Sequence, residues 1–146
     1  MRLVTIEANS QDAIGEYRRL DYPPLYSLPL HALEVRNAIL QRAFHQRRSI
    51  SSGERQHVAR ERDAALARLE HFMSRRALLD VTVDMDAAFA RAAMLSAAHT
   101  ERLGARAIDL LHVASALTLE SEQFLTTDAR QAQLAKAEGL KVVSTG

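Results

Sequence analysis

The chain has 146 residues, of which 47% are hydrophobic and 25% are charged. These shares are ordinary for one soluble globular domain and too apolar for an intrinsically disordered chain. The absence of cysteine excludes disulfides and thiolate metal sites. No apolar run reaches the roughly 18 residues of a membrane span, and the first residues lack the apolar region of a signal peptide. We therefore expect a cytoplasmic protein that has no membrane contact.

The formal net charge of +1 does not by itself indicate a nucleic-acid-binding protein. Residues 42–76 are nevertheless rich in arginine, with Glu54, Glu61, Asp63 and Glu70 interleaved among the arginines. Interleaved charges of this kind are more often the solvated face of a helix with local ion pairs than a binding patch. The sequence leaves both interpretations open.

The first predicted elements in chain order are a strand and two helices. A short apolar run over residues 24–27 is bounded by turn and polar residues, as expected for a strand. Ser27 is a candidate N-cap for a helix over residues 28–45, which carries apolar residues at helical intervals. A longer amphipathic helix is predicted over residues 53–72.

The second half of the chain alternates strands and helices. The helix predicted over residues 107–119 is apolar almost all round, so it should be buried. Asp84 or Asp86 is a candidate N-cap for the helix before it, and Gly139 is suited to end the last helix in the left-handed conformation. The remaining predicted elements are strands over residues 78–83, 123–126 and 141–144 and helices over residues 87–100 and 129–138.

Strands that alternate with helices predict an α/β fold, in which helices cover both faces of a central parallel sheet. Ligands of such sheets bind outside the carboxyl ends of the strands, where the N-termini of helices also gather. The search for a functional site therefore concentrates on this edge.

Three acids are placed at or just beyond that edge. Glu34 lies about two turns into the helix after the first predicted strand, Asp109 lies in the first turn of the apolar helix, and Asp128 follows the strand over residues 123–126. Hydrolysis of a phosphodiester needs a hard cation that polarises the phosphoryl group and activates water. Magnesium and manganese prefer oxygen ligands, which a cluster of carboxylates supplies.

Each acid also has a structural interpretation. Asp128 is a good helix N-cap, and Asp109 would favour the positive end of its helix dipole. Glu34 by itself is most simply an exposed helix residue. Asp109 is surrounded by apolar residues, however, and a buried charge needs a partner or a metal.

Four segments together resemble the PIN-domain family of ribonucleases, and in particular its VapC-like toxins. Residues 106–117 (RAIDLLHVASAL) resemble the family's acid followed by an apolar helix with small residues, and residues 124–130 (FLTTDAR) resemble its strand that ends in Thr-x-Asp. Residues 27–38 resemble the helix that presents the second acid, and residues 139–143 resemble the last turn and strand. The match runs from about Glu7 to the C-terminus.

The resemblance implies a three-layer α/β/α PIN-like domain that cleaves RNA with Mg2+, or alternatively Mn2+, as its cofactor. Glu34, Asp109 and Asp128 would be the second, third and fourth acids of the metal site, and Thr126 would be the hydroxyl residue that forms a hydrogen bond within it. The implied function is that of a toxin in a type II toxin–antitoxin system. Its partners would be an RNA substrate, a cognate VapB-like antitoxin and a second copy in a homodimer.

One part of the family pattern is missing. The family opens with a strand that ends in an Asp followed by Thr or Ser, and no Asp in that setting precedes Glu34. Residues 3–10 resemble the stretch after this Asp, so about fifteen residues are absent, a length typical of a strand, its turn and the start of a helix. We therefore expect residues 1–146 to form a single PIN-like domain that is N-terminally truncated. The loss of a central strand should leave unpaired backbone on both neighbouring strands.

Two alternatives remain open. Residues 1–6 are apolar and β-branched enough to form a replacement strand, which would bring Glu7 near the metal. The chain would otherwise be a catalytically inactive PIN-like module that binds an antitoxin or RNA, with activity restricted to a full-length form. Among the other residues, His112 is interpreted as packed and hydrogen-bonded rather than catalytic, and Met73, Met85 and Met94 as core residues.

Overall fold

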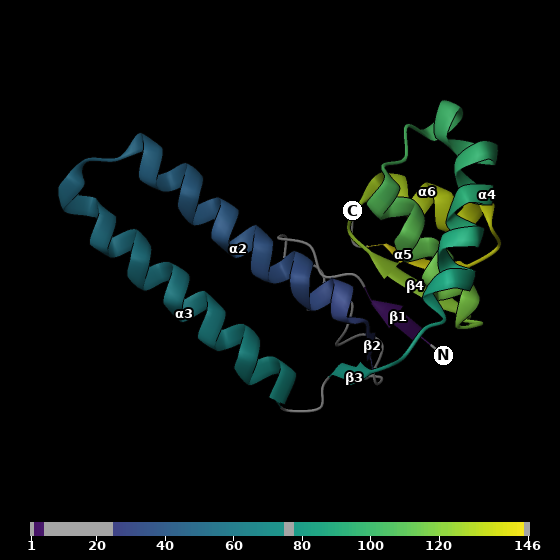
Figure 1. The fold of residues 1–146 in the computed structure, drawn as a ribbon, viewed down its shortest axis with the longest axis horizontal. Coiled ribbons are helices and arrows are strands. Elements are labelled where there is room, and N and C mark those ends of the chain that lie inside the picture. Colours follow the sequence, from purple (N-terminus) through teal and green to yellow (C-terminus); the bar gives the residue numbers. More distant parts are fainter. Residues whose placement is uncertain (1, 5–24, 75–77, 145–146) are drawn as a thin grey trace.

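The computed structural model describes residues 2–4, 25–74 and 78–144 of the chain. Within these ranges, five short parallel strands form one sheet in the order β3-β2-β1-β4-β5 (Figure 1). Their bounds are β1 Arg2–Val4, β2 Leu25–Ser27, β3 Leu78–Asp80, β4 Gln123–Thr126 and β5 Lys141–Ser144. The helices are α2 Pro29–Ser49, α3 Arg55–Ser74, α4 Met85–Leu103, α5 Ala107–Thr118 and α6 Ala129–Ala137, with a 3-10 turn η1 over Ser52–Glu54. The prediction of helices combined with a parallel sheet is confirmed.

The central position of the sheet is occupied by β1. Leu3 pairs with Tyr26 of β2 on one side and with Phe124 of β4 on the other, and both pairings are parallel. The expectation that the central strand is missing, with unpaired backbone on its neighbours, is therefore wrong. The alternative of a strand formed by the first residues is what the structure shows, for Arg2–Val4. Glu7, the acid that this alternative brings near a metal, lies outside the described residues.

Most predicted boundaries agree with the structure, and the exceptions have local causes. The strands predicted over residues 123–126 and 141–144 are β4 and β5. The strand predicted over residues 78–83 ends at Asp80, because its neighbour β2 ends at Ser27, whose carbonyl accepts one last bond from the Val81 N–H at 3.0 Å. Beyond that bond no strand continues alongside, and the chain leaves the sheet.

The start of α2 differs from its prediction in its capping residue. Ser27 was the expected N-cap, but the N-cap position is Leu28. The Ser27 hydroxyl donates to the Leu28 carbonyl at 3.4 Å, and the Leu28 N–H donates to Nδ1 of His31 at 3.0 Å. A histidine ring inside the first turn thus takes the backbone donor that would otherwise remain unsatisfied at the helix start.

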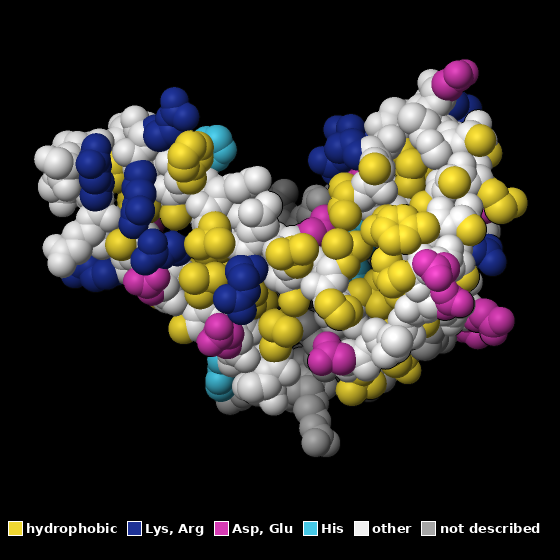
Figure 2. Space-filling view, in the orientation of Figure 1, with side chains coloured by type: hydrophobic (Ala, Val, Ile, Leu, Met, Phe, Trp, Pro, Cys, Tyr) yellow, Lys and Arg dark blue, Asp and Glu magenta, His cyan; other side chains and the backbone are white. Residues whose placement is uncertain are grey.

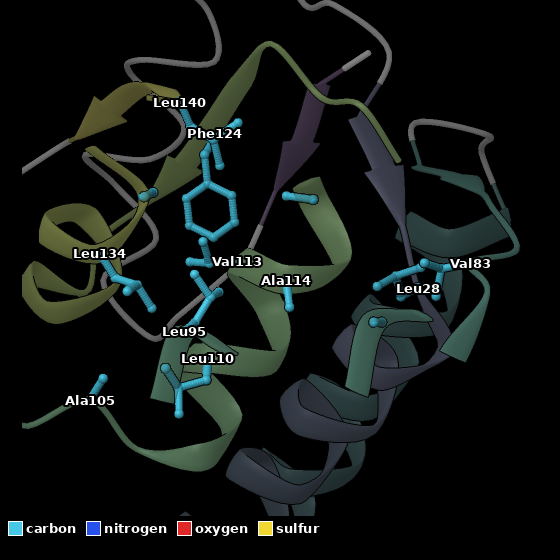
Figure 3. Close-up of a cluster of buried hydrophobic side chains, with 13 residues drawn as sticks. Leu28, Val83, Leu95, Ala105, Leu110, Val113, Ala114, Phe124, Leu134 and Leu140 are labelled. Atoms are coloured by element: carbon cyan, nitrogen blue, oxygen red, sulfur yellow. The ribbon is translucent and has the colours of Figure 1, made fainter. Parts of the chain in front are cut away.

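The buried core is built around α5, as its apolar sequence predicts. Val113 and Ala114 of α5 and Phe124 of β4 are fully buried, and Leu95 of α4 and Leu134 of α6 point into the same cluster (Figure 3). Burial of such side chains contributes about 1.5–3 kcal/mol each. The prediction of Met85 and Met94 as core residues is wrong, because 41% and 73% of their surfaces are exposed.

Helices α2 and α3 form an antiparallel hairpin that extends away from the sheet (Figure 1). We call this hairpin, residues 29–74, the arm, and the sheet with α4, α5 and α6 the body. The buried side chains of the arm are few, and among the described residues they are His31, Ala43 and Val58. No helix in the described part of the chain combines the length and apolar character that a bilayer-spanning segment requires.

Candidate functional site at the carboxyl edge of the sheet

The topology brings the starts of three helices to one edge of the sheet. Helix α2 follows β2 and α6 follows β4, so both begin at the carboxyl ends of their strands. Helix α5 leads back into β4, so its first turn lies at this same edge. The strand order also reverses between β1 and β4, the position where parallel α/β sheets bind their ligands. Glu34, Asp109 and Asp128 lie on or beside these three helix starts.

Asp109 is fully buried in the first turn of α5, and its two carboxylate oxygens each accept two hydrogen bonds. Oδ2 accepts from the backbone N–H and the Nε of Arg106, both at 2.9 Å. Oδ1 accepts from Nη2 of Arg106 at 3.0 Å and from Nε2 of Gln131 at 3.1 Å. Burial alone would raise the pKa of Asp109, but these hydrogen bonds from Arg106 and Gln131 outweigh it and lower the pKa. The carboxylate is therefore held ionised inside the protein.

Arg106 joins Asp109 to Asp128. Its Nη2 also donates to Oδ2 of Asp128 at 3.1 Å, so one guanidinium contacts two carboxylates that come from different elements. The other oxygen of Asp128 caps α6 and accepts from the backbone N–H groups of Arg130 at 2.8 Å and Gln131 at 3.1 Å. Asp128 therefore has the predicted N-cap role and, in addition, shares a cation with Asp109.

Thr126 and Gln131 support Asp109 and Asp128 through hydrogen bonds. The Thr126 hydroxyl donates to Oε1 of Gln131 at 2.9 Å and accepts from the Asp128 N–H at 3.1 Å, and both side chains are buried. In an ordinary capping box a Gln three residues after the N-cap would bind that N–H. Here Thr126 accepts that N–H instead, while Gln131 accepts from Thr126 through Oε1 and donates to Asp109 through Nε2. The Asp-x-x-Gln spacing was the signal that could have identified Gln131 from the sequence.

Glu34 contacts α5 one turn further along. Its Oε2 accepts from Nε2 of His112 at 2.5 Å, and the His112 side chain is fully buried while 34% of the Glu34 side chain is exposed. Nδ1 of His112 lies 3.2 Å from Nε2 of His31, and the two rings are inclined by only 13°. His31, which the sequence did not single out, thereby connects the start of α2 to Glu34 through His112.

The direction of these linked hydrogen bonds, which run from Leu28 to Glu34, follows from the first donor. The Leu28 N–H can only donate, so Nδ1 of His31 is an acceptor and the neutral ring carries its proton on Nε2. That proton is donated to Nδ1 of His112, which leaves the His112 proton on Nε2, facing Glu34. Burial, together with the nearby His112, lowers the pKa of His31 from its usual 6.5 to about 3, in agreement with a neutral ring. The linked histidines therefore present one N–H, that of His112 Nε2, to the Glu34 carboxylate.

The structure thus brings the predicted acids to α5 in two groups. Asp109 and Asp128 share Arg106, whereas Glu34 binds His112 at the next turn. Across the described ranges, no group of three or more His, Asp or Glu side chains is arranged to hold a metal ion. The donor set of carboxylate oxygens suits a hard divalent cation, and the position between Asp109 and Asp128 is taken by the Arg106 guanidinium. The Arg106 side chain is 51% exposed, and a metal ion at this position would require it to move away from both carboxylates.

The fold and this cluster define a parallel α/β domain with a carboxylate–arginine site at the carboxyl edge of its sheet. No model of a known protein family matches the sequence, and no curated protein matches it. The functional conclusion below therefore depends on the geometry of the site and on the sequence resemblance.

Proposed function

We propose that the protein is a metal-dependent endoribonuclease with a three-layer PIN-like fold, acting as the toxin of a type II toxin–antitoxin system. The observation that carries the proposal is the convergence of Asp109 and Asp128 on one cation, at the edge of a parallel sheet where ligands bind. Magnesium is commonly bound through one or two carboxylates together with waters and substrate phosphates, and Asp109 and Asp128 would supply two carboxylates from separate elements.

Asp109 and Asp128 would hold the ion, with Glu34 as the third carboxylate. A bound Mg2+ or Mn2+ would polarise the phosphoryl group of the RNA and lower the pKa of an attacking water. The protein side chains prepare the site: Gln131 fixes one oxygen of Asp109, Thr126 fixes Gln131, and His112 fixes one oxygen of Glu34. Arg106, once displaced, has a long exposed side chain that can pair with an RNA phosphate.

The test is cleavage of RNA by the wild type and two variants over a magnesium titration. Asp109→Asn keeps the shape of the side chain and removes its charge, so cleavage should fall by at least about a hundredfold, because even partners of metal ligands change activity tenfold to a hundredfold. Asp63→Asn removes a carboxylate that is exposed on α3 and pairs with Arg62, so cleavage should not change. Cleavage that needs no divalent metal and survives Asp109→Asn would contradict the proposal.

One observation favours a second function, an inactive PIN-like module that binds an antitoxin or RNA. The four acceptor positions of Asp109 are filled by protein donors, and Arg106 neutralises part of the charge that a metal would need. Arg106→Gln separates the two functions. In a metal enzyme this variant should bind magnesium more tightly than the wild type, and magnesium at a hundredfold excess over the variant's Kd should raise its free energy of unfolding by about 2.7 kcal/mol. In an inactive module magnesium should stabilise neither protein.

The proposed antitoxin or second copy needs an apolar surface, and the molecule exposes one. Large hydrophobic side chains are exposed on α2 (Leu33 at 63%, Leu40 at 44%) and on α4 (Phe89 at 57%, Met94 at 73%). Figure 2 shows hydrophobic side chains gathered over the body and along the arm on the face in view. A homodimer would be detected as a concentration-dependent mass in light scattering, and Phe89→Glu should shift it toward the monomer.

A further inference from the structure

The positive charge of the arm is concentrated at its far end. We call residues 42–60 the arm tip, and residues 29–41 with 61–74 the arm stem. The tip has five arginines (Arg42, Arg47, Arg48, Arg55 and Arg60) and one acid, Glu54, so its formal charge is +4, whereas the whole chain carries +1. The stem has three arginines and four acids and a formal charge of −1. Figure 2 shows the dark blue side chains gathered at the end of the arm that lies away from the body.

Ion pairing distinguishes the tip from the stem in the same way. In the stem, Arg36 pairs with Glu70 at 3.4 Å and Arg62 with Asp63 at 2.7 Å. At the tip all five arginines are exposed, and within the described part of the chain none of them pairs with a carboxylate. Glu54, the acid of the tip, instead accepts from the backbone and hydroxyl of Ser51 at 3.1 and 2.7 Å. Within the arginine-rich stretch 42–76, the interpretation as an ion-paired solvated face therefore holds for Arg62 in the stem and for none of the five tip arginines.

The tip also presents an aromatic ring. Phe44 is 55% exposed, and the guanidinium of Arg48 lies 5.5 Å from the centre of its ring. Positive side chains around an exposed aromatic ring are the combination that binds single-stranded nucleic acid, because arginines neutralise phosphates and the ring stacks on a base. Among the described tip residues, Phe44 is the one large apolar side chain that is exposed. A membrane surface would require a continuous apolar face, which the tip does not have.

We propose that the arm tip binds the phosphate backbone of RNA away from the carboxylate site, with Phe44 stacking on one base. The choice of RNA as the nucleic acid rests on the proposed function. Fourteen residues of α2 separate Glu34 from Arg48, which at about 1.5 Å per residue is roughly 21 Å. At about 3.4 Å per nucleotide this distance corresponds to roughly six nucleotides. RNA that reaches both the tip and the carboxylate site must be longer than this.

The experiment compares two triple variants with the same change in charge. The first is R47Q/R48Q/R55Q in the tip and the second is R36Q/R62Q/R68Q in the stem. Binding of a fluorescent 12-nucleotide RNA is measured by anisotropy in EDTA, at salt concentrations from 50 to 200 mM, and circular dichroism confirms that each variant is folded. The tip variant should bind at least about tenfold more weakly at low salt, and its salt dependence should fall by about 2 in log–log slope, because each lost phosphate contact removes about 0.7. The stem variant should bind within about twofold of the wild type.

Two further measurements complete the test. Phe44→Ala should weaken binding at least about fivefold through the lost base stacking. Equal weakening by both triple variants would show that bulk charge alone is responsible and would overturn the inference. Tip-dependent binding to phosphatidylserine vesicles without RNA binding would also overturn it and would assign the tip to a membrane surface. Because binding is measured without metal, tip-dependent RNA binding by a chain that does not cleave RNA leaves the inference standing and removes only the nuclease.

Discussion

The body and the arm differ in how many residues their helices bury. In the body, seven of the 12 residues of α5 are buried, and they include both the core side chains and the site residues Asp109 and His112. In the arm, α2 is longer, yet its buried residues are His31 and Ala43. Stability is therefore concentrated where burial is dense, and the arm is left with surfaces that can carry charge and meet partners.

The largest expected effect compares two phenylalanines. Phe124 is fully buried against α5, so Phe124→Ala should lower the free energy of unfolding by about 3–5 kcal/mol through lost burial and the cavity that remains. Phe44→Ala on the arm should change it by no more than about 0.5 kcal/mol, because the ring is exposed. Urea unfolding of both variants measures the difference. Similar losses would mean that the arm has a packing role that its burial does not show.

The next effect concerns acid stability at the junction of arm and body. The pKa of His31 is about 3 when folded and near 6.5 when unfolded, so between these values the unfolded chain binds a proton that the folded chain does not. The free energy of unfolding should therefore fall as the pH drops from 6.5 towards 3, by about 1.4 kcal/mol per pH unit at most. At lower pH the depressed pKa of Asp109 acts in the same direction, because its ionised form is the one that the fold stabilises.

His31→Asn removes this titrating group and should flatten the pH dependence measured by urea unfolding between pH 6.5 and 4.5. His57→Asn is the matched control, because 69% of the His57 side chain is exposed on α3. A wild-type slope that persists in His31→Asn would mean that another group causes the acid sensitivity.

The smallest expected effect is seen by replacing two glycines with alanine, which should change the stability in opposite directions. Gly139 ends α6 in the left-handed conformation at φ 82°, so Gly139→Ala should cost about 1–2 kcal/mol even though no atom lies within 4 Å of the added methyl. Gly53 lies in the turn between α2 and α3 with equal space and no positive φ, so Gly53→Ala should stabilise the protein by about 0.4–1 kcal/mol through the unfolded state. Thermal melts of the two variants measure both signs, and an equal change in both would show that the positive φ of Gly139 is not what separates the two positions.

Most of the secondary structure could be predicted from local patterns. The apolar helix before β4, the caps at Asp84 and Asp128 and the left-handed end at Gly139 all appear in the structure. Local steric and hydrogen-bonding preferences determine such features, and these preferences act over a few residues. The replacement strand at Arg2–Val4 was left as an alternative, because its place in the sheet depends on pairing with two strands that are distant in the sequence.

The candidate site could be predicted only in part. The acids Glu34, Asp109 and Asp128 were identified, but not the side chains that bind them. Arg106 was not identified as a partner of Asp109, although it lies three residues before it, a spacing at which opposite charges on a helix meet. The link from His31 through His112 to Glu34 has no such signal, because these side chains come from helices that are separated by more than 70 residues.

The sequence by itself determined which segments form helices and strands, which helix is buried and which acids lie near the carboxyl edge of the sheet. Tertiary structure decided which charges meet: Arg106 lies between Asp109 and Asp128, and His112 binds Glu34. Among the described residues it also gave carboxylate partners to Arg36 and Arg62 of the stem and to none of the tip arginines. The reason is that backbone preferences depend on neighbours along the chain, whereas an ion pair or a proton-sharing chain depends on distances of a few ångströms between side chains from different elements. Those distances are fixed only when the helices pack against the sheet.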